Sequence, residues 1–454
     1  MTQTAPAHPS LAEAARVWAR IALLSFGGPA GQIALMHRIL VEEKRWLSEQ
    51  RFLHALNFCM LLPGPEAQQL SIYAGWMLHR TVGGLIAGVL FILPGAAAIL
   101  ILSMLYMLYG QAGPLEALFF GLKAAVLAIL IQALIRISRR VLRARAALGV
   151  AVAAFVALSV FNIPFPVVIL GAAIAGFLLE RAGSTAFDPP AHAGPGGGQE
   201  LAAVIGTQAL AHAAPDLRRL MMTIGSGLTL WLAPVGALVL VLGPEAVFST
   251  VAVFFSQMAI LSFGGAYAVL AWVAQAGVET YGWLEPGEML DGLALAETTP
   301  GPLILVLQFV AFLAGAREAG GLDPLLAGAV SSGIALWVLF APSFLMVLAG
   351  APYMERLRSV RWLGAALGAI TAAVTGVIAS LALWFAQHTL FGEQVQVTGY
   401  GVDAALPVLA SADPAAIALT LAALAATLAL RAGVAVLLGG CAAAGLAFAA
   451  LGWI

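Results

Sequence analysis

The chain has little charge. Only 9% of its 454 residues are charged, against roughly 25% in an ordinary soluble domain, and 62% are hydrophobic. A soluble fold of this length would need a polar surface that this composition cannot supply. The formal net charge of −1 also argues against nucleic acid as a partner, because proteins that bind nucleic acid present clustered basic charge.

Residues for metal, redox or phosphate chemistry are also scarce. The two cysteines, Cys59 and Cys441, lie in apolar runs without metal-ligand spacing, and no two of the seven histidines pair at helical spacing. The sequence contains no phosphate-binding Gly-Lys-Ser/Thr motif and no evident nucleophile–base set. We therefore expect no metal, no cofactor and no enzymatic activity.

Long apolar runs are abundant instead. A helix needs about 20 apolar residues to cross a bilayer, and runs of that kind recur along the chain: Leu85–Leu108, Ala117–Ile135, Met222–Leu242, Leu325–Leu348 and Val434–Leu451. Backbone groups inside a bilayer must bond within their own segment, which favours helices. The sequence predicts an all-α polytopic membrane protein.

The chain contains two copies of one pattern. Three landmarks recur 237 residues further along: Ser25-Phe26-Gly27-Gly28 at Ser262-Phe263-Gly264-Gly265, Trp46 at Trp283, and Pro63-Gly64-Pro65 at Pro300-Gly301-Pro302. Further on, Pro94 corresponds to Pro342, which indicates a short insertion in the second copy. Shared spacing at separate landmarks is the signature of an internal repeat.

Composition sets the expected domain boundaries. A segment rich in Gly, Pro and Ala separates the copies and predicts an aqueous linker. The expected parts are an N-terminal repeat (1–182), a cytoplasmic linker (183–218), an extra connecting transmembrane helix (219–245) and a C-terminal repeat (246–454).

The distribution of Lys and Arg predicts that the copies have opposite orientations. Cytoplasmic loops are enriched in Lys and Arg. The loop that precedes Pro63 carries Arg38, Lys44, Arg45 and Arg51, whereas the matching loop around Trp283 carries Glu279, Glu285, Glu288 and Asp291. We expect the first loop inside and the second outside, as in inverted-repeat transporters.

The Pro-Gly-Pro motifs predict broken helices. Proline removes a backbone donor and glycine tolerates a bend, so each motif ends one helix and starts another. Residues 52–62 and 66–78 are each too short to span a bilayer, which favours a re-entrant hairpin. The Gly-Gly segments either cross or re-enter the membrane, and the sequence leaves both possibilities open.

Broken helix ends near the middle of a membrane form a natural anion site, because the free N–H groups carry positive partial charge. The candidate binding residues lie at or beside these breaks, with Lys123 added as a membrane cation: Ser25, Gly27, Gly28, Pro63, Gly64, Pro65, Gln68, Gln69, Ser262, Gly264, Gly265, Thr298, Thr299, Pro300, Gly301, Pro302, Gln308 and Lys123.

Structural explanations compete with these roles. Gln and Thr also bond neighbouring helices in membranes. Lys123 either attracts an anion or extends to the membrane surface. Glu66 and Glu297 are candidate proton-coupling residues, because carboxylates inside a bilayer are costly and usually functional. The alternative for these two is a partner for a helix dipole near the interface.

The motifs resemble those of the chromate ion transporter family. Ser25-Phe26-Gly27-Gly28-Pro29, Pro63-Gly64-Pro65-Glu66 and Glu297-Thr298-Thr299-Pro300 carry the resemblance, although Ala266 stands in the second copy where the first has Pro29. The resemblance covers nearly the whole chain except the linker. It implies chromate resistance by export across the bacterial inner membrane, driven by the proton motive force.

The residues alone support only an inverted-repeat transporter with an anion-binding core. Transport of another oxyanion such as sulfate remains open, because chromate and sulfate are similar tetrahedral dianions. An intramembrane enzyme is a further alternative, although it would require a catalytic set that the sequence lacks. Assembly as a homodimer is also left open.

Overall fold

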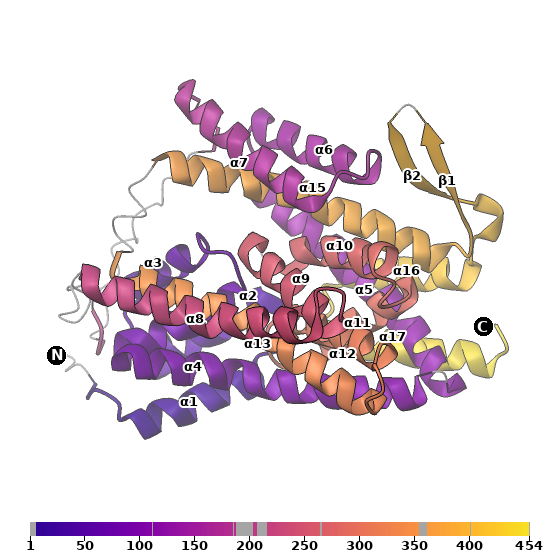
Figure 1. Cartoon of the computed structure of the whole chain (residues 1–454). Coiled ribbons are helices and arrows are strands. Elements are labelled where there is room, and N and C mark those ends of the chain that lie inside the picture. The colour runs from indigo at the N-terminus through magenta and orange to yellow at the C-terminus, as the bar shows by residue number, and fades with distance from the viewer. Residues whose placement is uncertain are drawn as a thin grey trace. The chain divides into compact units, whose positions relative to one another are not determined.

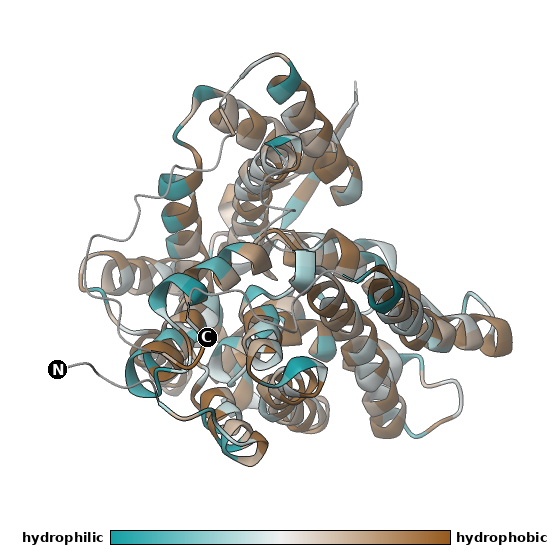
Figure 2. Ribbon diagram, turned by 90° about the vertical axis from the view of Figure 1, so that its left-hand side faces the viewer, coloured by the Kyte–Doolittle hydropathy of each residue, from teal (hydrophilic) through white to brown (hydrophobic). Residues whose placement is uncertain are grey.

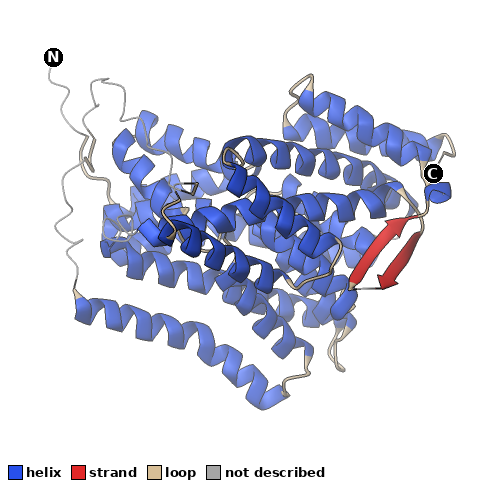
Figure 3. Cartoon of the chain, turned by 90° about the horizontal axis from the view of Figure 1, so that it is seen from above, coloured by secondary structure: helices blue, strands red, loops and turns tan. Residues whose placement is uncertain are grey.

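The protein is described here from a computed structural model, which is almost entirely helical (Figure 3). It describes residues 6–110, 112–184, 186–187, 203–206, 216–263, 266–353, 361–399 and 401–453. Five helical segments in these ranges are long and apolar enough to cross a membrane: Glu66–Tyr109, Gly113–Val141, Leu217–Leu242, Pro324–Tyr353 and Arg361–Leu390. The expected all-α polytopic membrane protein is confirmed.

Hydrophobic residues dominate the helices (Figure 2). Many of their side chains are exposed. In α8 (Leu217–Leu242), Leu240 is 87% exposed and Val241 is 80% exposed. Such a surface would be unfavourable in water, and large exposed apolar patches mark contact with protein or membrane. The hydrocarbon of a bilayer is the environment that this helix fits.

The chain forms two compact units. The first comprises Met1–Leu100, Pro189–Ala266 and Thr299–Arg361, and the second comprises Ile101–Asp188, Tyr267–Thr298 and Trp362–Ile454. Each unit therefore contains segments from both sequence copies. The two copies exchange segments instead of folding as separate halves.

The first unit holds the beginning of the first copy and two separate segments of the second, and Figure 1 labels its helices. Besides α8 and the first part of α4 (Glu66–Tyr109), its helices are α1 (Leu11–Leu24), α2 (Gly28–His37), α3 (Glu49–Cys59), α9 (Val247–Leu261), α12 (Val306–Arg317) and α13 (Pro324–Gly350). Short turns of other helix types lie at Arg38–Glu43, Leu303–Leu305 and Ala351–Tyr353. The core of this unit includes Trp18, Phe52, Phe58 and Trp76, all almost completely buried.

The second unit is also helical. Besides the end of α4, its helices are α5 (Gly113–Val141), α6 (Arg145–Ser159), α7 (Phe165–Arg181), α10 (Ala266–Gln275), α11 (Pro286–Thr298), α15 (Arg361–Leu390), α16 (Pro414–Leu428) and α17 (Val434–Ala450). Short turns lie at Ala276–Thr280 and Leu409–Ser411. Small residues permit close packing here, because a Cβ on Gly121 or Gly445 would collide with the backbone of the facing helix.

A β-hairpin in the second unit differs from the all-helical expectation. Strands β1 (Gln394–Gly399) and β2 (Val402–Pro407) pair antiparallel, with Val397 opposite Ala404. The alternation of Gln and Val in β1 is the period-two pattern of a strand. This alternating pattern is too short to be recognised as a strand in a sequence dominated by long apolar runs.

The order of helices repeats along with the sequence landmarks. α1, α2 and α3 are followed by the break at Pro63-Gly64-Pro65, and α9, α10 and α11 are followed by the break at Pro300-Gly301-Pro302. A short π-helical turn follows both α2 and α10, at Arg38–Glu43 and Ala276–Thr280. The two copies therefore fold locally in the same way, while their opposite membrane orientation stays a prediction.

Each Pro-Gly-Pro motif separates two short helices. α3 has 11 residues and α11 has 13, and both end before the motif. Beyond the first motif, α4 is interrupted at His79 and Arg80, whose backbone angles are not helical. Beyond the second, α12 has 12 residues and ends at Arg317. The prediction that helices break at both motifs is confirmed.

The half-helix after each break turns back along a longer helical segment that contains a proline. In α4 the two arms touch at Gly75 and Gly83, where a Cβ on either residue would collide with the other's carbonyl oxygen. In the second copy α12 packs against α13, with Gly315 facing Ser331. Pro94 and Pro342 lie in the corresponding longer helices.

Several expectations concern residues that the structure does not describe. Most of the linker, 183–218, lies outside the described residues. Of the linker, Ile205 pairs in parallel with Leu47, and the Arg51 side chain donates to the Gly206 carbonyl oxygen (3.2 Å). These contacts link the described part of the linker to the Arg-rich loop before α3. The cytoplasmic location of the linker stays a prediction.

Gly75→Ala tests the hairpin within α4. The added Cβ would force the two arms apart, and overpacking of this kind costs about 1–3 kcal/mol. Thermal unfolding of the detergent-purified protein should show a lower Tm. Gly149→Ala in α6 is the matched control, because a Cβ there meets nothing within 4 Å. An equal loss of Tm in both variants would show that the arms are not in contact.

Candidate functional site

Two reciprocal hydrogen bonds join the breaks of the two copies. The Gly64 N–H of the first Pro-Gly-Pro donates to the Ser262 carbonyl oxygen in the second copy (3.1 Å). The Gly301 N–H of the second Pro-Gly-Pro donates to the Ser25 carbonyl oxygen in the first (2.9 Å). Each broken segment therefore satisfies a backbone group of the other copy. All four residues lie in the first unit.

Only glycine fits the centre of each Pro-Gly-Pro motif. Gly64 has φ +125° and Gly301 has φ +106°, a region that other residues rarely adopt. A Cβ on Gly64 would also lie 2.6 Å from both Gln69 Nε2 and Ser343 Oγ. A Cβ on Gly95 would collide with the Pro300 carbonyl oxygen. The breaks are therefore packed by close contacts between backbone and side chains.

Four buried glutamines surround these breaks. Three use their amide nitrogen to bond a carbonyl oxygen: Gln32 to Gly301 (2.5 Å), Gln69 to Pro63 (2.6 Å) and Gln308 to Ala96 (2.9 Å). The side-chain oxygens of these three have no hydrogen-bond partner among the described residues. Gln32 was not predicted from the sequence, because its partner is 269 residues away.

Gln68 is the exception within this group. It is completely buried, and neither its Nε2 nor its Oε1 has a hydrogen-bond partner in the described part of the chain. Buried polar atoms in native proteins are almost always bonded to protein, water or ligand. Gln68 therefore supplies a donor and an acceptor for a polar molecule.

Gln68 lies in the first turn of α4, directly after the break. The N–H groups of a helix's first turn have no partner inside the helix, and the end carries positive partial charge. The Gln69 N–H already bonds the Pro65 carbonyl oxygen (3.0 Å), whereas residues 66–68 precede this bond. A helix N-terminus with an unpartnered buried amide beside it is suited to an anion. Glu66, the first residue of α4, is only half-buried.

The serine hydroxyl groups of the Gly-Gly segments are already bonded within their own segments, so these segments offer the site backbone groups and not hydroxyl groups. The Ser25 hydroxyl donates to the Ile21 carbonyl oxygen (2.7 Å), and the Ser262 hydroxyl donates to the Ala259 carbonyl oxygen (3.1 Å). Gly27 and Gly28 both have positive φ, and open space lies where their Cβ atoms would be. Gly264 and Gly265 lie outside the described residues.

The predicted residues before the second break divide between the units. Thr299 to Pro302 belong to the first unit, whereas Glu297 and Thr298 end α11 in the second. Glu297 is buried, and its Oε1 accepts a hydrogen bond from the Tyr267 hydroxyl (2.7 Å). The Thr298 hydroxyl donates back to the Leu295 carbonyl oxygen (2.8 Å) and its side chain is exposed.

Lys123 has a partner that the sequence did not reveal. Its Nζ lies 3.3 Å from Asp291 Oδ1. The sequence interpretation placed Asp291 in an outer loop, but the structure buries it in α11, where it is 5% exposed. The Tyr106 hydroxyl donates to Asp291 Oδ2 (2.9 Å). The assignment of Asp291 to a loop was wrong, because the sequence does not show that a carboxylate is buried when its partner lies far along the chain.

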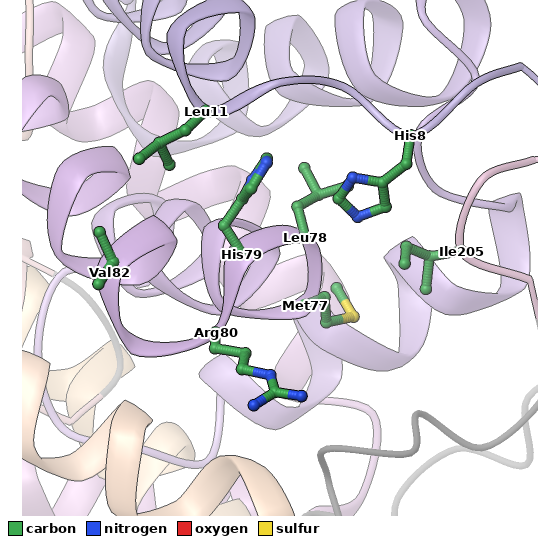
Figure 4. A pocket seen from close by; sticks show the side chains of 8 residues that line it. All are labelled: His8, Leu11, Met77, Leu78, His79, Arg80, Val82 and Ile205. Carbon is green, nitrogen blue, oxygen red and sulfur yellow. The ribbon is translucent and has the colours of Figure 1, made fainter.

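A cavity of about 470 Å³ opens at the turn within α4 (Figure 4). His8, His79 and Arg80 bring nitrogen-bearing side chains to a lining that is otherwise apolar and contains no carboxylate. The His8 and His79 rings lie edge to face with centroids 5.1 Å apart, and the Arg80 guanidinium extends away from them. Arg80 has φ +53° and ψ −149°, a region that is essentially restricted to glycine. None of these residues was predicted as a site.

A second cavity, of about 240 Å³, lies in the second unit beside the β-hairpin and contains Glu279 and Asp403. Hydrogen bonds from Gln396 (2.5 Å) and Asn162 (3.2 Å) lower the pKa of Asp403, so it stays ionised. Burial raises the pKa of Glu279. The lining carries acidic groups and no Lys or Arg, so this cavity does not suit an anion.

Metal binding finds no support in the residues that the structure describes. Among them, no group of three or more His, Cys, Asp or Glu side chains is placed to hold a metal ion.

Gln68→Leu should separate ligand binding from stability. Removing a buried amide that bonds no protein group is nearly neutral for folding, whereas Gln32→Leu would strand the Gly301 carbonyl oxygen at a cost of about 1–3 kcal/mol. We expect Gln68→Leu to keep the wild-type Tm and to lose the stabilisation that an added oxyanion gives. A Gln68→Leu variant that still responds to the oxyanion would exclude this residue from the site.

Comparison with known proteins identifies the family. The profile of the chromate transporter family matches residues 12–177 and 249–446. The chromate transport protein of Pseudomonas aeruginosa is 30% identical over 397 residues, which covers 86% of this chain and 84% of the relative.

Two further relatives are similar over comparable lengths. The probable chromate transport protein of Synechococcus elongatus is 26% identical over 84% of this chain and 87% of its own. The chromate transport protein of Cupriavidus metallidurans is 26% identical over 85% of each. No solved structure matches the chain. The chain belongs to the chromate transporter family, whose members are membrane transporters and not enzymes.

Proposed function

We propose that this protein is a secondary active transporter that exports chromate across the bacterial inner membrane. Relatives that share most of its length are named as chromate transport proteins. The observation that carries the proposal is Gln68, a buried amide without a protein partner at the N-terminus of a broken helix. Its donor and the first-turn N–H groups of α4 suit the oxygens of a tetrahedral oxyanion.

The proposed site binds the anion with dipoles. The Gln68 amide and the α4 backbone N–H groups are neutral donors. The Gln69 amide is already bonded to the Pro63 carbonyl oxygen within the break. Neutral donors neutralise a dianion only partly, which keeps release possible. They also distinguish chromate from sulfate weakly, since both ions present four oxygens in a tetrahedron.

The membrane potential supplies part of the driving force for export. A charge gains about 2.3 kcal/mol per 100 mV across a membrane, so a dianion leaving a negative interior gains about 4.6 kcal/mol at that potential. Coupling to protons would need a carboxylate that titrates near the anion. Glu66 at the first break and Glu297 before the second are the proposed carriers.

The two carboxylates differ in their surroundings. Glu297 is buried against the Tyr267 hydroxyl, whereas Glu66 is half-buried at the start of α4. A nearby dianion disfavours an ionised carboxylate by like charge. Anion binding therefore favours a protonated carboxyl, and loss of the proton favours release of the anion.

Glu297→Gln and Glu66→Gln keep the shape of the side chain and remove the carboxyl group that binds and releases a proton. We expect at least one of them to weaken the pH dependence of transport, measured as chromate flux in membrane vesicles across a series of pH values. Glu285→Gln, at an exposed residue before α11, is the control and should retain the wild-type pH profile. Unchanged profiles in both single variants and in the double variant would exclude these carboxylates as coupling sites.

Chromate accumulation tests the function itself. Cells that express the protein should hold less chromate than cells without it, and inside-out vesicles should take chromate up when energised. Excess sulfate tests selectivity in the same vesicles. Equal accumulation with and without the protein, together with no uptake by vesicles, would contradict chromate export.

A further inference from the structure

A buried ion pair links two helices of the second unit. Lys123 of α5 lies 3.3 Å from Asp291 of α11, and the side chains are 26% and 7% exposed. The Tyr106 hydroxyl, at the end of α4, holds the other oxygen of the Asp291 carboxylate. Burying opposite charges is favourable only when they pair closely, and removing one partner strands the other.

The charges around Asp291 come from three helices. Lys123 of α5 acts on it as a cation, Tyr106 of α4 as a hydrogen-bond donor, and Glu288 of its own helix as a like charge. Lys123 is the one cation in this set. The ionised carboxylate therefore depends on Lys123 for its compensation.

Lys123 keeps capacity for a second partner. An ammonium group has three N–H donors, and the ion pair that the structure gives Lys123 among the described residues is with Asp291 Oδ1 alone. Gly287 lies beside it, where even a Cβ would come within 3.2 Å of Nζ. The absence of a side chain at this position leaves room at the ammonium group, and the quarter of the Lys123 side chain that is exposed offers an approach for an anion.

We propose that Asp291 occupies the place of the transported oxyanion at Lys123, and that a proton on Asp291 releases the lysine to bind that oxyanion. The proposal rests on the proposed function and deepens it. The proton bonds Oδ1 of Asp291, Tyr106 retains Oδ2, and Lys123 Nζ then donates to an oxyanion oxygen. When the proton leaves, the carboxylate regains Lys123 and the anion is displaced.

A dianion that binds together with one proton carries a net charge of −1. The membrane potential still favours its movement out of a negative interior. Only the membrane potential drives this step outward, because a proton that leaves together with the anion moves against its own gradient. The exchange also avoids an unpaired buried charge at each stage, because Lys123 always faces either the carboxylate or the oxyanion.

Proton uptake on anion binding tests the exchange. Purified full-length protein is mixed with chromate at alkaline pH, where chromate itself carries no proton, in weakly buffered solution that reports proton uptake. We expect wild-type protein to take up one proton for each chromate bound. Asp291→Asn should bind chromate about tenfold more tightly, a coupling of ordinary size, and take up no proton at this site.

Three further variants make the result decisive. Lys123→Gln should bind chromate more weakly than Asp291→Asn does, because it lacks the ammonium group. Lys123→Gln/Asp291→Asn has no buried charge, so it keeps the test possible if a single variant fails to fold, and should bind weakly without proton uptake. Glu285→Gln, at an exposed residue just before the same helix, is the control and should take up protons as wild type does.

The outcomes separate the two proposals. Chromate binding by wild-type protein without proton uptake, or proton uptake in Asp291→Asn that equals the wild-type uptake, would overturn the exchange at Lys123 and leave chromate transport standing. No chromate binding by wild-type protein, together with no chromate transport in cells, would overturn both.

Discussion

The crossed hydrogen bonds between the two breaks are the constraint on which the first unit depends. A Pro-Gly-Pro segment exposes backbone groups that an apolar environment cannot solvate. The Gly64 N–H reaches the Ser262 carbonyl oxygen, and the Gly301 N–H reaches the Ser25 carbonyl oxygen. Each copy therefore supplies the acceptor for a backbone N–H group in the break of the other. The same arrangement brings the α4 N-terminus and the buried glutamines to one place.

The two units differ in the charge that they offer to an anion. Around the breaks, Gln68 and the α4 N-terminus offer an anion neutral donors. In the second unit, Lys123 offers a full charge that Asp291 already compensates. A neutral donor costs less to bury without a ligand than an unpaired ammonium group does. This difference explains why a carboxylate accompanies the lysine and why none of the glutamines needs a counter-ion.

Much of the local structure could be predicted from the sequence, because proline and glycine act through their own backbone chemistry. The breaks at Gly64 and Gly301 and the short helices beside them follow from that chemistry. The contacts of Gln32 with Gly301 and of Lys123 with Asp291 could not be predicted, because each joins residues far apart in the chain. The exchange of segments between the copies is also a long-range property, and local patterns do not contain it.

The orientation of the copies is the claim that labelling tests most directly. A single cysteine is placed either at Lys44, in the Arg-rich loop before α3, or at Glu285, in the matching loop before α11. Intact cells are then treated with a membrane-impermeant thiol reagent, with the buried Cys59 and Cys441 replaced by alanine. Inverted copies predict labelling at position 285 and none at position 44 until the membrane is permeabilised. Equal labelling of both positions in intact cells would contradict the inverted arrangement.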